Sequence, residues 1–146
     1  MPALELTKPT GDIFATLERM PDNAYIYAHW IGRQDLDTIK KGGNAFLEAI
    51  RQQPCSKLLN SHKELIGPWD VANDWITTVW TPAVIASGLH YMAQVLAPGI
   101  YGQTSFHMLH QRIGDMLEIK IFDNVADAIQ WLESIPASNT ETALQL

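Results

Sequence analysis

Apolar and polar positions alternate along the first part of the chain and then recur at helical spacing. Ile13 to Arg19 alternates with a period of two, and Ala24 to Ile31 is rich in aromatic residues, with Pro21 to Asn23 supplying a turn between them. This pattern predicts an antiparallel hairpin. After Asp35, which can cap a helix, apolar residues recur every three or four positions, and this predicts an amphipathic helix that ends before Pro54.

The second half of the chain alternates short apolar runs with helical stripes. Lys57 to Asn60 predicts a short central strand, and Ser61 to Pro68 predicts a loop after it. The stripe from Trp69 to Gly88 predicts a long helix that Pro82 kinks or splits. Four further elements are expected: a strand over Leu89 to Ala97, a helix over Thr104 to Ile113, a strand over Leu117 to Phe122 and a helix over Val125 to Ile135.

Strands that alternate with helices imply parallel pairing through right-handed crossovers. We therefore expect a single α/β domain, in which helices pack on a mixed, mostly parallel sheet of about five strands and only the first strand runs antiparallel. Residues 1–11 are expected to form an N-terminal extension, residues 12–135 the domain, and residues 136–146 a flexible C-terminal tail. A site in such a sheet lies at the carboxyl ends of the strands, here the Ser61 to Pro68 and Pro98 to Gln103 loops.

The composition of the chain argues against nucleic-acid binding and against association with membranes. The 146 residues carry 10 Lys and Arg against 16 Asp and Glu, a formal charge of −6, which lacks the positive surface that nucleic-acid phosphates or an anionic membrane require. No apolar run approaches the ~18 residues of a membrane span, and Met1 to Lys8 does not resemble a secretory signal. The single cysteine, Cys55, fits a reducing compartment. We expect a cytoplasmic protein without nucleic-acid or integral membrane association.

The sequence carries none of the common catalytic motifs. The patterns GxSxG, GxGxxG and GxxxxGK[ST] are all absent. His107 and His110 supply fewer ligands than a metal site needs, and Asp70 and Asp74 fit the positive end of a helix dipole better than a catalytic pair. We therefore expect a protein that is not an enzyme and that uses no metal or cofactor.

The tryptophans are the least ordinary feature of the sequence. Four of the five, Trp30, Trp69, Trp75 and Trp80, lie in the second predicted strand or the second predicted helix. Trp75 belongs to the core by its helical phase. Trp69 and Trp80 lie at the margin of the apolar stripe, where an indole can face a pocket or a partner. The alternative is that both residues simply cover the edge of the sheet.

Three stretches of the chain, Ala24 to Trp30, Lys57 to Pro98 and Ile121 to Leu132, resemble the small bacterial STAS-like domains. The similarity is carried chiefly by the strand that ends in Leu-Leu-Asn and by the phrase Phe-Asp-Asn before the last helix. These domains are relatives of the sporulation-type anti-sigma-factor antagonists and are often grouped with CRAL-TRIO-like lipid-binding domains. The resemblance extends from Asp12 to Ile135 and implies a STAS-like fold and a non-enzymatic binding domain.

In that family a phosphorylatable serine follows the third strand at the start of the next helix, within an Asp-Ser-Ser-Gly type of phrase. The corresponding segment here, Asn60 to Gly67, reads NSHKELIG and has no Asp-Ser-Ser. Ser61 is the nearest match in position, and Lys63 is close enough in sequence to accept the added charge of a phosphate. The resemblance therefore makes Ser61 a candidate phosphoacceptor. The Asp-Ser-Ser-Gly type of motif that would orient a kinase partner is missing here.

Two functions remain open from the sequence. The first is a regulatory protein-interaction module that uses the Ser61 to Pro68 loop and Trp69 as its recognition surface. The second is a carrier or sensor of a small apolar, lipid-like ligand in a pocket between sheet and helices. Open strand edges make a homodimer a candidate assembly in either case. The candidate binding residues are Asn60, Ser61, His62, Lys63, Trp69, Trp80 and Tyr101. For the second function, the residues expected to line the pocket are Trp30, Trp80, Tyr91 and Tyr101.

Overall fold

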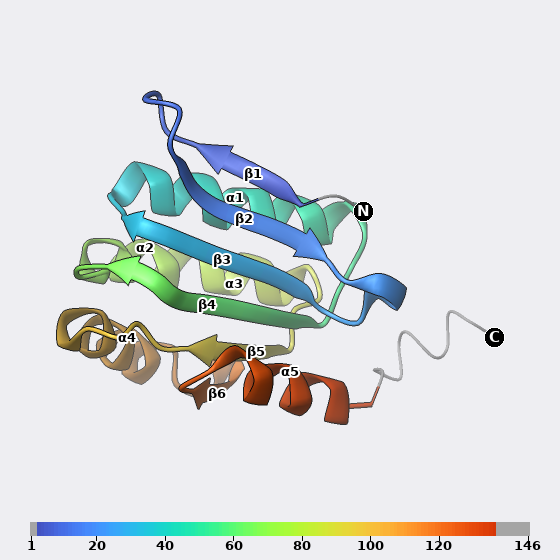
Figure 1. Ribbon diagram of the computed structural model, residues 1–146. Helices are drawn as coiled ribbons and strands as arrows, with labels where there is room; N and C mark the ends of the chain where they lie inside the picture. Colours follow the sequence, from blue (N-terminus) through green and yellow to red (C-terminus); the bar gives the residue numbers. More distant parts are fainter. Residues whose placement is uncertain (1–2, 137–146) are drawn as a thin grey trace.

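Six strands form one continuous sheet with helices on both faces in the computed structural model, which describes residues 3–136 (Figure 1). The strands are β1 (Leu4–Thr7), β2 (Ile13–Arg19), β3 (Ile26–Arg33), β4 (Lys57–Ile66), β5 (Tyr91–Val95) and β6 (Glu118–Phe122). The longer helices are α1 (Leu36–Gln52), α4 (Ile100–Ile113) and α5 (Val125–Ser134). A broken helical segment consists of η2 (Asp70–Ala72), α2 (Asn73–Trp75), η3 (Ile76–Trp80) and α3 (Thr81–Ala86), and single turns η1 (Pro21–Asn23) and η4 (Gly114–Met116) complete the chain.

The order of the strands in the sheet follows their order along the chain, from β1 at one edge to β6 at the other. β2 runs antiparallel to both neighbours, and β3 to β6 pair in parallel. The register places Asn60 of β4 between Ala28 of β3 and Gln94 of β5. The predicted mixed, mostly parallel α/β architecture is therefore confirmed, with six strands where about five were expected.

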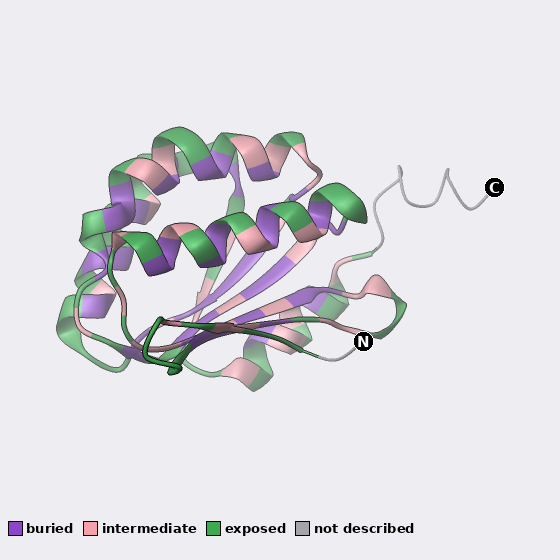
Figure 2. Cartoon of the chain, turned by 90° about the horizontal axis from the view of Figure 1, so that it is seen from above, coloured by how far each residue is buried: buried purple, intermediate pink, exposed green. Residues whose placement is uncertain are grey.

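The three crossover connections lie on one face of the sheet. Each steps in the same direction across the sheet, and right-handed crossovers in one direction place their helices on the same side. α1, the broken segment and α4 bury the larger core there, and their buried residues face the sheet in Figure 2. α5 follows β6 and packs on the opposite face, against β4, β5 and β6.

Local signals in the sequence explain where α1 begins and how closely it packs. Asp35 and Thr38 form a reciprocal capping box, in which each side chain accepts a hydrogen bond from the other residue's backbone N–H. One turn further along, a Cβ atom added at Gly42 would lie 2.2 Å from the Trp30 ring. One added at Gly43 would lie 2.9 Å from the ring of Trp75. The two glycines therefore allow α1 to approach the tryptophans.

Gly42→Ala is expected to lower the free energy of unfolding by about 1–2 kcal/mol, although alanine is the better helix former. The new methyl group meets the buried ring of Trp30, so either the ring or α1 must shift. Asn44→Ala, on the exposed face of the same helix, is the control and should raise stability by about 0.5 kcal/mol. Urea denaturation measures both variants. Equal stability gains in both would contradict the close packing of α1 on Trp30.

Two predictions about the strands need correction. The predicted N-terminal extension contains β1, which pairs with β2 and contributes Leu6 to the larger core. The predicted loop from Ser61 to Pro68 is wrong as far as Ile66, because these residues continue β4. β3 is long enough to pair with β4 as far as Arg33 and Ile66, with one shift of register between His29 and Ile31, so most of the polar segment has a backbone partner.

The helix predicted from Trp69 onward is split, as the position of Pro82 suggested. Its turns change from 3-10 to α to π before α3 begins, and Pro82 lies at the start of α3. Proline has no N–H to donate, so it interrupts the regular hydrogen-bond ladder in the preceding turn. The hydroxyl groups of Thr77 and Thr78 donate to the carbonyl groups of Asn73 and Asp74, both at 2.8 Å.

The ends of the last helices also differ slightly from expectation. α4 begins at Ile100 instead of Thr104, so the predicted Pro98 to Gln103 loop is mostly the first turn of a helix. α5 begins after Asn124, whose side chain accepts a hydrogen bond from the backbone N–H of Asp127. The predicted tail, from residue 137 onward, lies outside the described residues.

Candidate functional site

A small cavity lies in the larger core, between the sheet and the helices that cover it. Its volume is about 40 Å³, and most of its wall is aromatic or aliphatic. Four of the five tryptophans contribute to this wall. The residues that line the cavity are Trp30, Ile39, Gly43, Asn60, His62, Trp69, Trp75, Ile76, Trp80, Met92, Phe106, Leu109 and Ile113.

A chain of polar side chains crosses the floor of this cavity on three neighbouring strands. The indole N–H of Trp30 donates to Asn60 Oδ1 at 2.9 Å, and Asn60 Nδ2 donates to Gln94 Oε1 at 2.8 Å. His62 Nε2 lies 3.3 Å from Asn60 Nδ2. The His62 ring also packs on Trp69, with the ring centroids 4.5 Å apart. This network lets polar residues occupy the centre of the sheet without losing all their hydrogen bonds.

Burial lowers the pKa of His62 to about 3. No carboxylate pairs with this imidazole among the described residues, so the charged form has nothing to offset its loss of water. The native state therefore holds His62 neutral. The unfolded chain takes up the proton as the pH falls below the ordinary value of 6.5, so protons favour unfolding between pH 6.5 and about 3.

His62→Gln is expected to weaken the loss of stability in acid. Between pH 6 and pH 4 the wild type should lose about 1.4 kcal/mol per pH unit more than the variant, because only the wild type gains a proton at this position on unfolding. The free energy of unfolding measured in urea at each pH gives the comparison. His107→Gln changes a histidine at an exposed position on α4 and is the control. Its free energy of unfolding should depend on pH as that of the wild type does. Identical slopes for wild type and His62→Gln would show that His62 is not held neutral.

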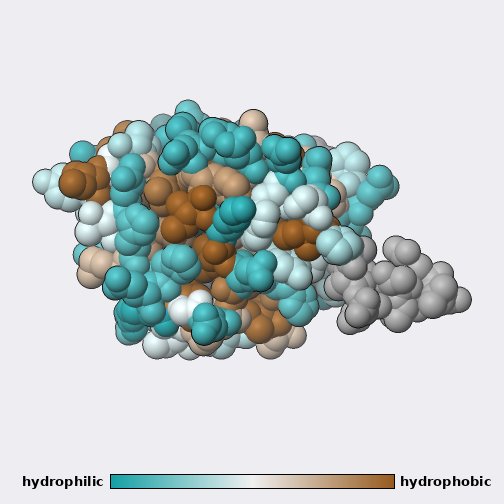
Figure 3. All heavy atoms as spheres, turned by 90° about the horizontal axis from the view of Figure 1, so that it is seen from below, coloured by the Kyte–Doolittle hydropathy of each residue, from teal (hydrophilic) through white to brown (hydrophobic). Residues whose placement is uncertain are grey.

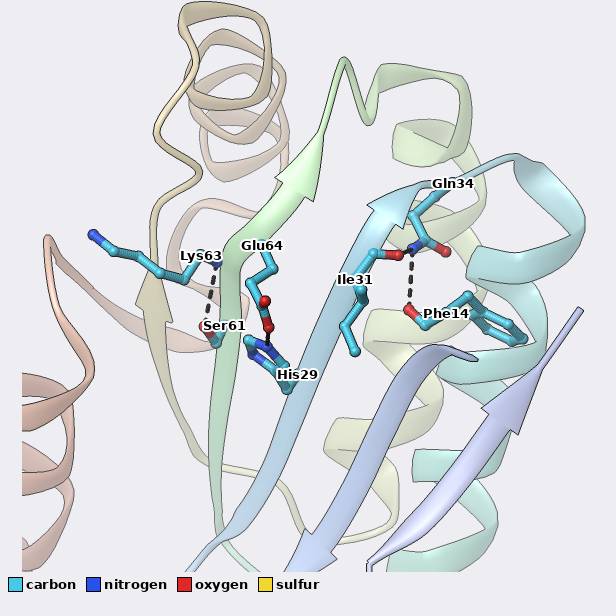
Figure 4. A network of polar contacts seen from close by, with 7 residues as sticks. All are labelled: Phe14, His29, Ile31, Gln34, Ser61, Lys63 and Glu64. Carbon is cyan, nitrogen blue, oxygen red and sulfur yellow. Dashed lines mark hydrogen bonds and ion pairs between the residues drawn. The ribbon is translucent and has the colours of Figure 1, made fainter. Parts of the chain in front are cut away.

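A second polar cluster lies on the opposite face of the sheet. Ser61 reaches this face by the alternation of side chains along β4, and the shift of register between β3 and β4 brings Glu64 to the same face. His29 of β3 and Glu64 of β4 point toward each other and pair through His29 Nε2 and Glu64 Oε2 (Figure 4). Ser61 lies across from His29 in the register. No local pattern in the sequence indicates this grouping, since it depends on the pairing of two strands separated by a long helix.

Ser61 has no exposed surface, and its hydroxyl group is already bonded. Ser61 Oγ accepts the backbone N–H of Lys63 at 3.3 Å and also hydrogen bonds to the Tyr27 hydroxyl. Burial raises the pKa of Tyr27, and the Ser61 hydrogen bond partly opposes this effect. A serine in this setting is poorly placed as a nucleophile or as a kinase substrate. The next helix starts after Ile66, so Ser61 lies in the middle of a strand instead of at a helix start.

An exposed apolar edge forms where the parallel strands end. Ile66 at the end of β4 is 54% exposed, and Ile100 and Tyr101 in the first turn of α4 are 73% and 72% exposed. We call these three residues the carboxyl rim. Figure 3 shows brown, apolar surface at the end of the molecule where α4 lies in Figure 1. Isolated apolar residues are common on surfaces, but three at one edge mark a candidate contact site.

The carboxyl rim is held in place by contacts between α4 and the end of β4. A Cβ atom added at Gly102 would lie 3.5 Å from the carbonyl oxygen of Gly67, so the helix packs directly on that turn. Ser105 Oγ accepts the backbone N–H of Trp69 at 3.0 Å and donates to the carbonyl oxygen of Tyr101 at 2.9 Å. The rim therefore belongs to a fixed part of the fold.

The structure separates the predicted binding residues into three places. Asn60, His62, Trp69 and Trp80 line the cavity, Ser61 and Lys63 lie on the opposite face, and Tyr101 lies on the rim. Trp69 and Trp80 are both buried, so neither forms an exposed recognition surface. Of the aromatic residues expected in a ligand pocket, Trp30 and Trp80 line the cavity, whereas Tyr91 packs on Trp131 beneath α5. Sequence reasoning missed Gln94 and Ile100.

The described residues contain no group of three or more His, Cys, Asp or Glu side chains that could hold a metal ion. His107 and His110 lie on α4, where Phe106 contacts both rings. Within residues 3–136, no helix combines the length and the apolar character needed to cross a bilayer.

Comparison with protein-family models and with curated protein sequences gives no match. Solved structures do match. The anti-sigma factor antagonist SpoIIAA in its unphosphorylated form has a TM-score of 0.60, with 14% identity over 84% of this chain and 99% of that chain. An uncharacterised DUF3478 protein from Shewanella loihica with a SpoIIAA-like fold has a TM-score of 0.49, with 16% identity over 81% of this chain and 91% of that chain. The match to SpoIIAA shows that the chain has the SpoIIAA-like, STAS-like α/β fold that the sequence resemblance implied.

Proposed function

We propose that this chain is a non-enzymatic regulatory module that binds a protein partner through the carboxyl rim. The SpoIIAA-like fold supports the general class, since the similar structure is that of an antagonist that acts on another protein factor. The rim supports the location, because it lies at the carboxyl ends of the parallel strands, where α/β sheets commonly bind. The partner has an apolar anchor side chain that packs against Tyr101.

The exposure of the rim is the observation on which the proposal rests. Ile100 and Tyr101 are the two most exposed of the large apolar side chains in the described chain. Covering them removes apolar surface from water, and a tyrosine at the centre of a contact is a frequent hot spot. Because α4 is fixed to the end of β4, little ordering of the rim is needed on binding.

A carrier of a lipid-like ligand is the weaker candidate. Pockets for drug-sized ligands measure ~300–1,000 Å³, whereas the cavity here measures about 40 Å³. Tyr91 and Tyr101, two of the residues expected to line such a pocket, lie elsewhere. We therefore favour the protein-interaction module.

The test is site-specific photocrosslinking in lysate of the source organism. A photoreactive phenylalanine analogue replaces Tyr101 in one protein and Val79, a 52% exposed residue on η3, in the control. We expect an adduct with a different protein from position 101 only, attached at an apolar residue of that protein. Ile100→Asp should reduce its yield at least tenfold, as expected for a charge placed in a buried contact. No adduct, equal adducts from both positions, or an adduct with a second copy of this chain would contradict the proposal.

A further inference from the structure

The edge of the sheet formed by β6 has no strand on its outer side. β6 lies at the opposite edge from β1, and within residues 3–136 it pairs with β5 alone (Figure 1). α5 packs mainly on the strands inside this edge, since the buried strand residues Leu59, Ala93 and Val95 beneath it belong to β4 and β5. Unpaired backbone groups along a sheet edge are a template for a further strand.

The hydrogen bonds to β5 show which backbone groups of β6 face outward. Both ends of β6 bond to the chain around β5, from Glu118 N to the His90 carbonyl oxygen at 3.3 Å and from Leu96 N to the Phe122 carbonyl oxygen at 3.1 Å. The backbone groups of alternate residues in a strand point to opposite neighbours. Lys120 therefore also faces β5, whereas the N–H and C=O groups of Ile119 and Ile121 point away from it. Leu117, whose backbone is extended, faces outward in the same way.

The side chains of β6 alternate between the two faces of the sheet. Ile119 and Ile121 are half-buried and pack against the larger core. Glu118 and Lys120 are exposed on the face that carries α5, where Lys120 Nζ lies 5.7 Å from the centre of the Phe122 ring. Neither charged side chain forms an ion pair in the described part of the chain. The edge therefore presents apolar side chains on one face and two opposite, unpaired charges on the other.

Charge complementarity selects one register for a second β6 strand placed antiparallel to the first. A two-fold axis at Ile119 puts Glu118 of each copy opposite Lys120 of the other. These positions are the non-hydrogen-bonded ones, where cross-strand side chains lie closest. An axis at Lys120 would put two lysines opposite each other, and an axis at Glu118 would do the same with two glutamates. An axis between two residues would set apolar side chains against charged ones, and an axis at either end of β6 would leave less of the strand paired.

We propose that β6 is a dimerisation edge, which pairs antiparallel with β6 of a second copy of this chain about a two-fold axis at Ile119. The outward-facing backbone groups of Leu117, Ile119 and Ile121 bond to those of the other copy, and the two sheets join into one. Pairing of β6 with β1 of another copy would leave a free edge at each end and add copies without limit, whereas pairing of β6 with β6 closes as a dimer. The carboxyl rim lies on β4 and the start of α4, so this dimer does not depend on the proposed protein partner.

Two charge reversals and their mixture test the register. Sedimentation of the full chain, from micromolar to millimolar concentration, should show a monomer and a dimer in equilibrium and no larger species. Glu118→Lys places lysine opposite lysine at the contact, and Lys120→Glu places glutamate opposite glutamate. Each variant alone should therefore raise the dimer dissociation constant about tenfold or more. An equimolar mixture of the two restores both pairs of opposite charges, so heterodimers should form about as tightly as the wild-type dimer.

Lys41→Glu is the control, because it reverses a charge at an exposed position of α1 away from this edge. Its dimer dissociation constant should equal that of the wild type. The proposal would be overturned by a wild type that stays monomeric at every concentration or that grows beyond a dimer. It would equally be overturned if the mixture associated no more tightly than the single variants, or if Lys41→Glu weakened the dimer as much as Lys120→Glu.

Hydrogen exchange, measured by nuclear magnetic resonance at low and high protein concentration, tests which edge pairs. The amide hydrogens of Ile119 and Ile121 point outward in the monomer and are bonded in the dimer, so their exchange should slow about tenfold or more where the dimer predominates. The amide of Lys120 already faces β5 and should change less. Slower exchange along β1 with no change at Ile119 and Ile121 would show that another edge forms the contact, and would overturn the proposal.

Discussion

Asn60→Leu is expected to lower the free energy of unfolding by about 3 kcal/mol or more. Asn60 is the residue through which the cavity network is connected, so its loss leaves Trp30 Nε1, Gln94 Oε1 and His62 Nε2 without their present partner. Each unmatched buried polar group costs about 1–3 kcal/mol, and the burial of leucine offsets only part of the total. Urea denaturation of wild type and variant measures the difference.

Asn44→Leu is the matched control for this experiment, because it makes the same change at an exposed position of α1. The control should change stability by less than about 0.5 kcal/mol. A small effect for Asn60→Leu, similar to that of Asn44→Leu, would mean that the polar chain across the sheet is not formed.

Tyr101→Ala is expected to weaken binding of the crosslinked partner about 30-fold or more. An interface tyrosine of this kind contributes about 2 kcal/mol or more when it packs against an apolar anchor. The side chain is 72% exposed in the free protein, so its removal should leave the melting temperature almost unchanged. Titration calorimetry with the purified partner measures the affinity.

Val79→Ala is the control for the binding measurement, since Val79 is apolar and exposed but lies on the broken helical segment. Its affinity for the partner should equal that of the wild type. If Tyr101→Ala also bound as tightly as the wild type, the carboxyl rim would not be the contact surface.

Hydrophobic periodicity predicted most of the layers of this fold. The stripe in α1 and the alternation in β2 and β6 each indicate one buried face, and alternating strands and helices imply parallel pairing. β1 escaped prediction because its four residues form too short a pattern to separate from a disordered end. The end of β4 escaped for a different reason. Its polar residues resemble a loop, and only the cross-strand partners in β3 stabilise them in a strand, since the pairing with β5 stops at Ser61.

The candidate site was predicted in part. Asn60, His62 and Trp80 drew attention as unusual residues, and all three line the cavity. Their sequence context suggested that these side chains are exposed. Their burial could not be predicted, because strand register determines a residue's partners across a sheet and leaves no local signal in the sequence. Ile100 was placed in a loop because Pro98 and Gly99 precede it, although both residues are also compatible with a helix start.

Hydrogen exchange of the complex tests the central claim most directly. Amide exchange is measured by mass spectrometry for the free chain and for the chain saturated with the crosslinked partner. The account predicts added protection in residues 66–71 and 99–104, around the carboxyl rim, with little change in β1, β2 and α5. Protection confined to α5 and β6, or no change around residues 99–104, would contradict it.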